Sequence, residues 1–206
     1  MTATFTDQHA TKLREYLKSH ELSVGEGDED SACTVAAINL AMTGKVHDKR
    51  PACMSAVVHG AVIILQDEIP DEMRNSARYK ALVPHMAGTG MEREDERSAV
   101  LLNWMWDVVL PQLQDMADKR GFGAEWREMC QAKTRGAADA AAYAARPAAY
   151  AAYAARAAYV AAAADAARTA AYVAADAADA AAAAGFWEAV DLIGALERVV
   201  FLGEKQ

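Results

Sequence analysis

The stretch of sequence that decides the fold is AADAAAYAARPAAYAAYAARAAYVAAAADAARTAAYVAADAADAAAAA, residues 137–184, in which 32 of 48 residues are alanine. Alanine has the highest helix propensity of all residues, and the only proline in the stretch is Pro147. We therefore predict a short helix that ends near Arg146 and a long helix that begins at Pro147, since proline is favoured in the first turn of a helix. Disorder is disfavoured, because the stretch has neither low helix propensity nor high net charge.

The residues that separate the alanine pairs gather on one face of these predicted helices. At 100° per residue, a stripe about 100° wide contains Asp139, Tyr143, Tyr150, Asp165, Arg168, Tyr172, Asp176 and Asp179. The opposite face is almost bare alanine, which allows a neighbouring helix to approach closely. We expect the alanine face to pack inward and the other residues to point outward.

Tyrosine and arginine make this alanine-rich segment a candidate binding surface. Both residue types are enriched at binding hot spots, and a ring can stack on a base while a guanidinium binds phosphate. The candidate residues, called the Tyr/Arg stripe below, are Tyr143, Arg146, Tyr150, Tyr153, Arg156, Tyr159, Arg168 and Tyr172. The alternative is a solvated helix face without a partner.

The remainder of the chain has the punctuation of successive helices, with few strand-like alternations. Helices are expected over residues 7–20, 31–42, 51–68, 76–86, 91–119, 124–134 and 186–202. The fold class is therefore all-α: a multi-helix bundle with a long alanine-rich helix and a C-terminal closing helix. We expect a helical core over residues 1–134, with residues 135–206 packed on it as one globular unit.

Three signals refine the expected helices. Thr89 and Glu92 have the spacing of a capping box at the start of the helix over 91–119. Pro111 should kink that helix, and Pro84 should interrupt or end the one over 76–86. The turn before the capping box resembles an anion-binding turn, yet phosphate binding there is disfavoured because four carboxylates follow it at Glu92, Glu94, Asp95 and Glu96.

Composition excludes several classes of protein. The net charge of −8 argues against non-specific binding of nucleic acid, which depends on lysine and arginine. Cys33, Cys53 and Cys130 lack the spacing of a disulfide framework or a zinc site. The N-terminus lacks the order of a signal peptide, and the apolar run over 54–65 is too short to span a bilayer. We expect a cytoplasmic protein without a cofactor, a catalytic residue set or a membrane association.

Polar residues embedded in apolar helices form a second candidate site. A buried polar group is costly unless it is hydrogen-bonded, so these residues either satisfy one another or line a pocket. The set consists of Asn39, His59, Asn103, Trp104 and Asp107. Asn103 and Asp107 share a helix face at i, i+4, and Trp104 could form an aromatic wall.

Paired carboxylates give an enzymatic alternative. Glu68 and Asp71, and Glu92 and Asp95, have the spacings Glu-x-x-Asp, and two helices could present them to Mg²⁺. This arrangement resembles all-α nucleoside triphosphate pyrophosphohydrolases, and it implies metal-dependent hydrolysis of a nucleotide. Solvated helix ends explain the same residues.

The Ala-Ala-X helix and the apolar helix after it, residues 135–203, resemble alanine-rich helical accessory proteins of phages and mobile elements, and more distantly alanine-rich immunity proteins of bacterial toxin systems. The resemblance implies a role in conflict between phage, host or toxin, performed by binding. Our leading hypothesis is a non-catalytic protein of the immunity or anti-defence type that neutralises a protein partner or sequesters a small nucleotide signal. A third possibility is a structural homo-oligomer that self-associates through the alanine face.

Overall fold

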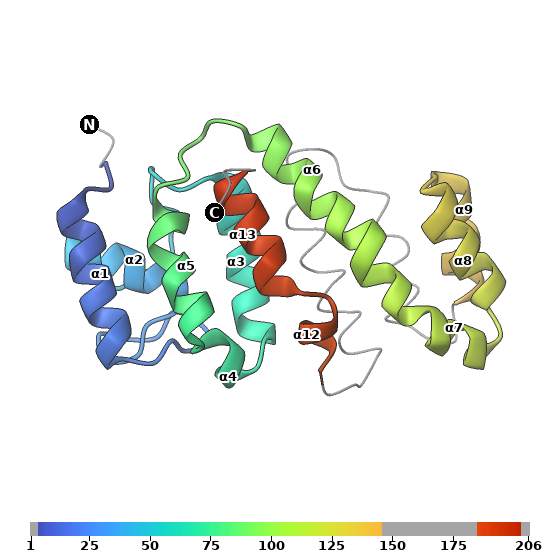
Figure 1. Cartoon of the computed structure of the whole chain (residues 1–206), viewed down its shortest axis with the longest axis horizontal. Coiled ribbons are helices and arrows are strands. Elements are labelled where there is room, and N and C mark those ends of the chain that lie inside the picture. Colours follow the sequence, from blue (N-terminus) through green and yellow to red (C-terminus); the bar gives the residue numbers. More distant parts are fainter. Residues whose placement is uncertain (1–3, 146–184, 203–206) are drawn as a thin grey trace. The chain divides into compact units, whose positions relative to one another are not determined.

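The computed structural model describes residues 4–145 and 185–202, and this part of the chain is helical throughout (Figure 1). The described residues contain no strand, only an isolated bridge between Gly27 and Ala32. The predicted all-α class is confirmed. Among the described helices, none has the length and apolar character that crossing a membrane requires.

The described chain forms two compact units. The first comprises residues 4–97 and 196–202, and the second comprises residues 98–145 and 185–195. This division of the described residues is a separate observation from the compositional change near residue 134. Helices α6 (Glu94–Trp104) and α13 (Leu192–Phe201) each run uninterrupted across a boundary, so composition does not mark it.

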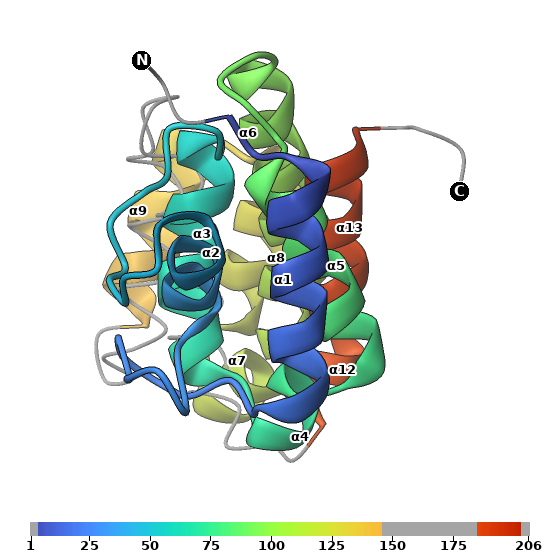
Figure 2. The same ribbon diagram turned by 90° about the vertical axis from the view of Figure 1, so that its left-hand side faces the viewer.

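The first unit is built mainly from the N-terminal helices. Figure 2 shows α1 and α5 running alongside each other, and α1 also packs against α2. Apolar side chains such as Leu13, Ile38 and Leu65 fill the interior. Besides the ends of α6 and α13, the unit contains α1 (Asp7–Ser19), α2 (Thr34–Thr43), α3 (Ala56–Glu68), α4 (Asp71–Arg74) and α5 (Ala77–Ala87).

The start of α3 corrects two sequence-based expectations. The helix begins at Ala56 rather than at Pro51, because the Ser55 hydroxyl accepts hydrogen bonds from the amides of the first turn. The predicted capping box at Thr89 is also wrong: the Thr89 hydroxyl accepts from the Ser55 amide at 2.9 Å, and α6 begins later, at Glu94. The Glu94 carboxylate accepts from the amides of Ala56 and Val57 at 3.1 and 3.0 Å, so α3 is capped by distant residues.

Prolines act differently in the two units. Pro84 lies buried inside α5, which continues to Ala87 instead of ending, because the apolar residues around the proline are buried with it. Pro111 distorts its helix as predicted: a π-helical turn, η1 (Met105–Val109), is followed by a 3₁₀ turn, η2 (Leu110–Leu113). The indole of Trp126 donates to the Leu110 carbonyl in this distorted region, at 2.9 Å.

The second unit continues with short helices. These are α7 (Gln114–Arg120), α8 (Gly123–Ala132), α9 (Arg135–Ala144) and α12 (Phe186–Ala189). The expected single helix over 186–202 is broken between α12 and α13, where Asp191 has a positive φ of 45° and its carboxylate accepts from the Gly194 amide. Trp104 donates its indole N–H to the Val190 carbonyl at 2.6 Å, next to this break.

In α9 the alanine-rich pattern behaves as predicted. Ala138, Ala141 and Ala145 are buried, whereas Asp139 is exposed and Tyr143 is 68% exposed. The alanine face therefore packs inward in this helix, which lies against α8. The rest of the alanine-rich segment, residues 146–184, lies outside the described residues.

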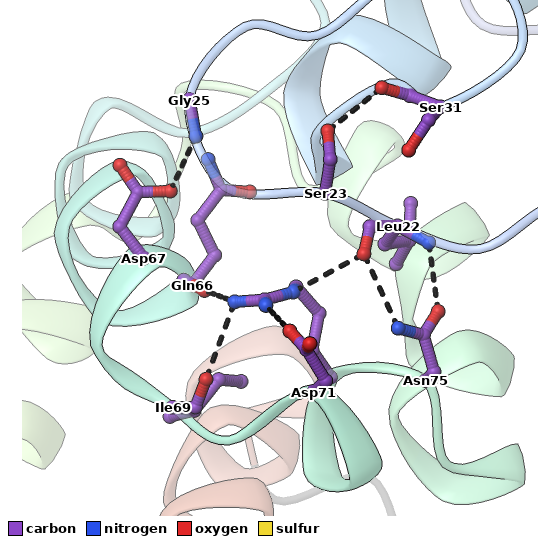
Figure 3. A network of polar contacts seen from close by, with 10 residues as sticks. Leu22, Ser23, Gly25, Ser31, Gln66, Asp67, Ile69, Asp71 and Asn75 are labelled. Carbon is purple, nitrogen blue, oxygen red and sulfur yellow. Dashed lines mark hydrogen bonds and ion pairs between the residues drawn. The ribbon is translucent and has the colours of Figure 1, made fainter.

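A buried guanidinium joins three segments of the first unit (Figure 3). Arg74, 2% exposed, donates to the carbonyl oxygens of Leu22, Gln66 and Ile69, and it pairs with Asp71. These carbonyls belong to the loop after α1 and to the end of α3. Asn75 adds a pair of hydrogen bonds to Leu22. Arg74 thereby satisfies backbone oxygens that no helix pairs.

We predict that Arg74→Met lowers the free energy of unfolding by about 3 kcal/mol, because it strands buried carbonyls that each cost about 1–3 kcal/mol when unpaired. Urea unfolding followed by circular dichroism measures the change. Arg78→Met is the control: Arg78 is half exposed and paired with Glu197, so its loss should cost less than about 1 kcal/mol. Equal losses in the two variants would contradict the role given to Arg74.

A second prediction concerns Tyr79, which is 1% exposed and whose hydroxyl is 3.0 Å from that of Thr34. Burial raises the pKa of Tyr79 from 10.0 to about 12. The phenol of the unfolded chain ionises at a lower pH than the phenol of the folded protein. The contribution of Tyr79 to the free energy of unfolding is therefore complete below pH 10 and is lost as the pH rises toward 12. Between these pH values the free energy of unfolding of the wild type should fall by on the order of 2 kcal/mol more than that of Tyr79→Phe. A constant difference between the two proteins over this range contradicts the prediction.

Candidate functional site

Two adjoining hollows lie in the first unit, beside α1 and α5. Each has a volume of about 480 Å³. The first, called the arginine hollow, is bounded by the start of α1, the end of α5, the segment before α6 and the end of α13. Its polar and aromatic lining residues include Phe5, Asp7, Arg14, His85, Glu92, Arg93, Arg97 and Phe201.

Arg97 is the least ordinary residue of the arginine hollow. Its side chain is 5% exposed and donates to two backbone carbonyls, those of Glu92 and Thr89. Its Nε–H is buried without an acceptor, and the ion pairs among the described residues do not include Arg97. Burial lowers the pKa of this guanidinium, because desolvation disfavours the charged form. The charge is thus compensated only by carbonyl dipoles and by carboxylates at longer range.

Arg93 and Arg14 add two more guanidinium groups. Arg93 donates from Nε and Nη2 to the carboxylate of Glu96, at 2.9 and 2.7 Å, and this partner lowers the pKa of Glu96. It also donates to the carbonyl of Leu202, which ties the end of α13 to the segment before α6. Arg14 is exposed on α1 and lines both hollows.

Aromatic rings stand beside the arginines. The ring of His85 lies 5.0 Å from that of Phe201 and is tilted by 58° to it. The ring of Phe5, which is half-buried just before α1, contacts the ring of His9 in the first turn of that helix. Rings in such a hollow offer a π-face to a planar ligand.

The charged groups around the arginine hollow nearly balance. Three guanidinium groups and the carboxylates of Asp7 and Glu92 line it, and Glu96, which is bound to Arg93, brings a third carboxylate to the same cluster. The hollow is therefore less acidic than the chain as a whole, which carries −8.

The second hollow, called the lysine groove, lies between α1 and α5. Its apolar lining consists of Leu17, Ala77, Ala81 and Pro84, and its basic lining consists of Arg14, Lys18, Lys80 and His85. Among the described residues, no carboxylate lines it. The ammonium of Lys80 donates to the carbonyl of His20 at 2.8 Å.

Asn39 and His59 from the predicted polar site come together around one loop. Asn39 donates from its amide to the carbonyls of His47 and Lys49, both at 2.8 Å, and the ring of His59 lies 3.0 Å from the carbonyl of Asp48. These two residues hold the loop between α2 and α3. Each of these two side chains therefore bonds to the backbone of this loop.

Asn103 and Asp107 differ from the expectation of burial. Both side chains are exposed, because the helix around them is buried on one face only, with Trp104 on the buried face. Asp107 forms an ion pair with Lys133 at the end of α8. Asn39 and His59 belong to the first unit, whereas Asn103, Trp104 and Asp107 belong to the second.

The Tyr/Arg stripe is described only at Tyr143, which is exposed. Its other members, Arg146, Tyr150, Tyr153, Arg156, Tyr159, Arg168 and Tyr172, lie outside the described residues. Of the paired carboxylates, Asp71 pairs with Arg74. The described residues contain no group of three or more histidine, cysteine, aspartate or glutamate side chains placed to hold a metal ion.

Sequence reasoning missed Arg14, Arg93, Arg97 and Lys80. Arg93 and Arg97 stand among acidic residues and read as part of a solvated charged segment. In the structure two of the nearby carboxylates are engaged, since Glu94 caps α3 and Glu96 pairs with Arg93, whereas Glu92 lines the hollow.

We predict that Arg97→Met changes the free energy of unfolding by less than about 1 kcal/mol, in contrast to Arg74→Met. The carbonyls of Thr89 and Glu92 lie near the surface and can be hydrated when Arg97 is removed, and the cost of burying the charge disappears. Urea unfolding of both variants under the same conditions tests this. A loss in Arg97→Met as large as that in Arg74→Met would show that Arg97 is a structural residue.

Comparisons with known proteins add no family to this description. No protein-family model, curated protein or solved structure matches the chain. The function is therefore argued from the two hollows and from the groups that line them.

Proposed function

We propose that this protein is a non-catalytic binding protein that sequesters a small anionic ligand of the nucleotide class in the arginine hollow. The observation that carries the proposal is the buried guanidinium of Arg97, a lining residue of the hollow whose buried Nε–H has no acceptor among the described residues. A buried polar group without a partner is costly and rare in proteins, and it is a common mark of a functional site.

The size of the hollow suits such a ligand. Ligand pockets have volumes of about 300–1,000 Å³ and combine apolar walls with a few placed polar groups. The arginine hollow has about 480 Å³, with Phe5, Val200 and Phe201 among its apolar walls. A mononucleotide has a volume of this scale, and its base and phosphate suit the apolar walls and the polar groups of the hollow.

The chemistry of the lining matches the two parts of a nucleotide. Arg14, which is exposed, can present a planar, charged fork to phosphate oxygens, while Arg97 and the Glu96-bound Arg93 add their charges beside it. The rings of His85 and Phe201 offer a stacking surface for a base. Asp7 and Glu92 fit the amino and hydroxyl groups of a nucleoside as acceptors.

This proposal selects one branch of the hypothesis drawn from the sequence. The compositional resemblance to accessory proteins of phages suggests that the ligand is a nucleotide signal that the protein removes from solution. Neutralisation of a protein partner through the Tyr/Arg stripe remains a separate prediction, because seven of the eight residues of the stripe lie outside the described ranges.

The experiment is isothermal titration of the purified protein with AMP and ADP, preceded by native mass spectrometry to detect a ligand retained from expression. We expect measurable binding that Arg97→Met and Arg14→Gln each weaken about tenfold or more, since a hydrogen bond to a charged group contributes about 1.5–3 kcal/mol. Arg78→Met, which removes a guanidinium of the same unit outside the hollow, is the matched control.

Two results would overturn the proposal. The first is the absence of both a retained ligand and any heat of binding with either nucleotide. The second is binding that survives Arg97→Met and Arg14→Gln but is lost when Tyr150, Tyr153 and Arg156 are replaced together by alanine, which would transfer the site to the Tyr/Arg stripe.

A further inference from the structure

We infer that the lysine groove is a second subsite for the same ligand, so that the ligand is a dinucleotide with one phosphoryl group in the arginine hollow and another among Arg14, Lys18 and Lys80. This inference rests on the proposed function. It follows from the continuity of the two hollows, which share Arg14, Pro84 and His85 as lining residues.

Helix α1 sets the span of the combined site. Asp7 lines the arginine hollow at one end of this helix, and Lys18 lines the lysine groove at the other. These residues are eleven positions apart, which corresponds to roughly 16 Å at 1.5 Å per residue. One mononucleotide occupies one hollow of about 480 Å³, and the second hollow, of equal volume, remains for a second nucleotide.

The lining of the lysine groove fits a phosphorylated and partly apolar group. Arg14, Lys18 and Lys80 supply three positive charges, and no carboxylate lines the groove to oppose them. Leu17, Ala81 and Pro84 supply an apolar floor on which a ring can lie. On a chain with a net charge of −8, a groove that is both basic and apolar fits an anion that carries a planar ring.

Lys80 and Arg14 have defined positions in this arrangement. The Lys80 ammonium donates to the carbonyl of His20, which holds it at the groove and leaves two of its N–H groups for a ligand. Arg14 lies where the hollows meet, so its guanidinium can contact both halves of the ligand. The ring of His85, which also lines both hollows, stands beside this junction.

The test compares the linear dinucleotide pApA with AMP by isothermal titration. We expect pApA to bind at least about tenfold more tightly than AMP, since a second phosphoryl group adds a charge-assisted contact. The double variant Lys18→Gln/Lys80→Gln should lower the ratio of the two affinities about tenfold, because its main effect falls on the second subsite. Arg97→Met should weaken both nucleotides.

The controls separate this inference from folding effects and from the proposed function. Lys12→Gln removes a lysine of the same helix outside the groove and should leave the ratio unchanged; Lys18→Gln alone provides a milder variant if the double variant melts at a lower temperature. Equal affinities for pApA and AMP, or an unchanged ratio in the double variant, would overturn the second subsite while AMP binding upholds the first. Absence of binding by either nucleotide would overturn both.

Discussion

The first unit depends on the burial of one guanidinium. The end of α3 leaves carbonyl oxygens that have no partner inside the helix, and the loop after α1 brings another. Arg74 donates to the carbonyls of Leu22, Gln66 and Ile69 from a single side chain. A planar group with five fixed donors can satisfy several oxygens at once, which an apolar residue of the same volume cannot do. The loop over residues 22–31 is held against α3 by this network and by the bond from the Gly25 amide to Asp67.

Arg97 is a second buried arginine of the same unit, and its surroundings differ from those of Arg74. Arg74 has acceptors in the interior and a carboxylate partner in Asp71. Arg97 has two carbonyl acceptors near the surface, a buried Nε–H without an acceptor and a hollow beside it. Burying a charge costs free energy unless it is paired, so Arg74 fits a structural role, and the proposed function assigns Arg97 to the binding of an anion. The two hollows differ in their lining, with guanidinium groups and rings in the arginine hollow and ammonium groups beside apolar residues in the lysine groove.

The segment between α5 and α6 connects the fold to the candidate site. Thr89 and Glu94 turn toward the start of α3, where they satisfy amides that α3 itself leaves open. Arg93 and Arg97 of the same segment turn the other way and line the arginine hollow. The acidic residues that seemed from the sequence to exclude an anion are therefore largely used in capping and ion pairing. A short segment rich in both charges can serve both purposes because successive side chains leave the backbone in different directions.

The sequence by itself determined the helical class and most of the described helices. Helix propensity and apolar periodicity act over a few positions, so the helix over residues 7–20 and the alanines of α9 could be interpreted without a structure. Only the tertiary structure decided that the described chain forms two compact units, that Asn103 and Asp107 are exposed, and that Arg14, Arg93 and Arg97 line one hollow. The physical reason is that burial, ion pairing and the assembly of a hollow depend on which distant segments pack together, and this information is not carried by local periodicity.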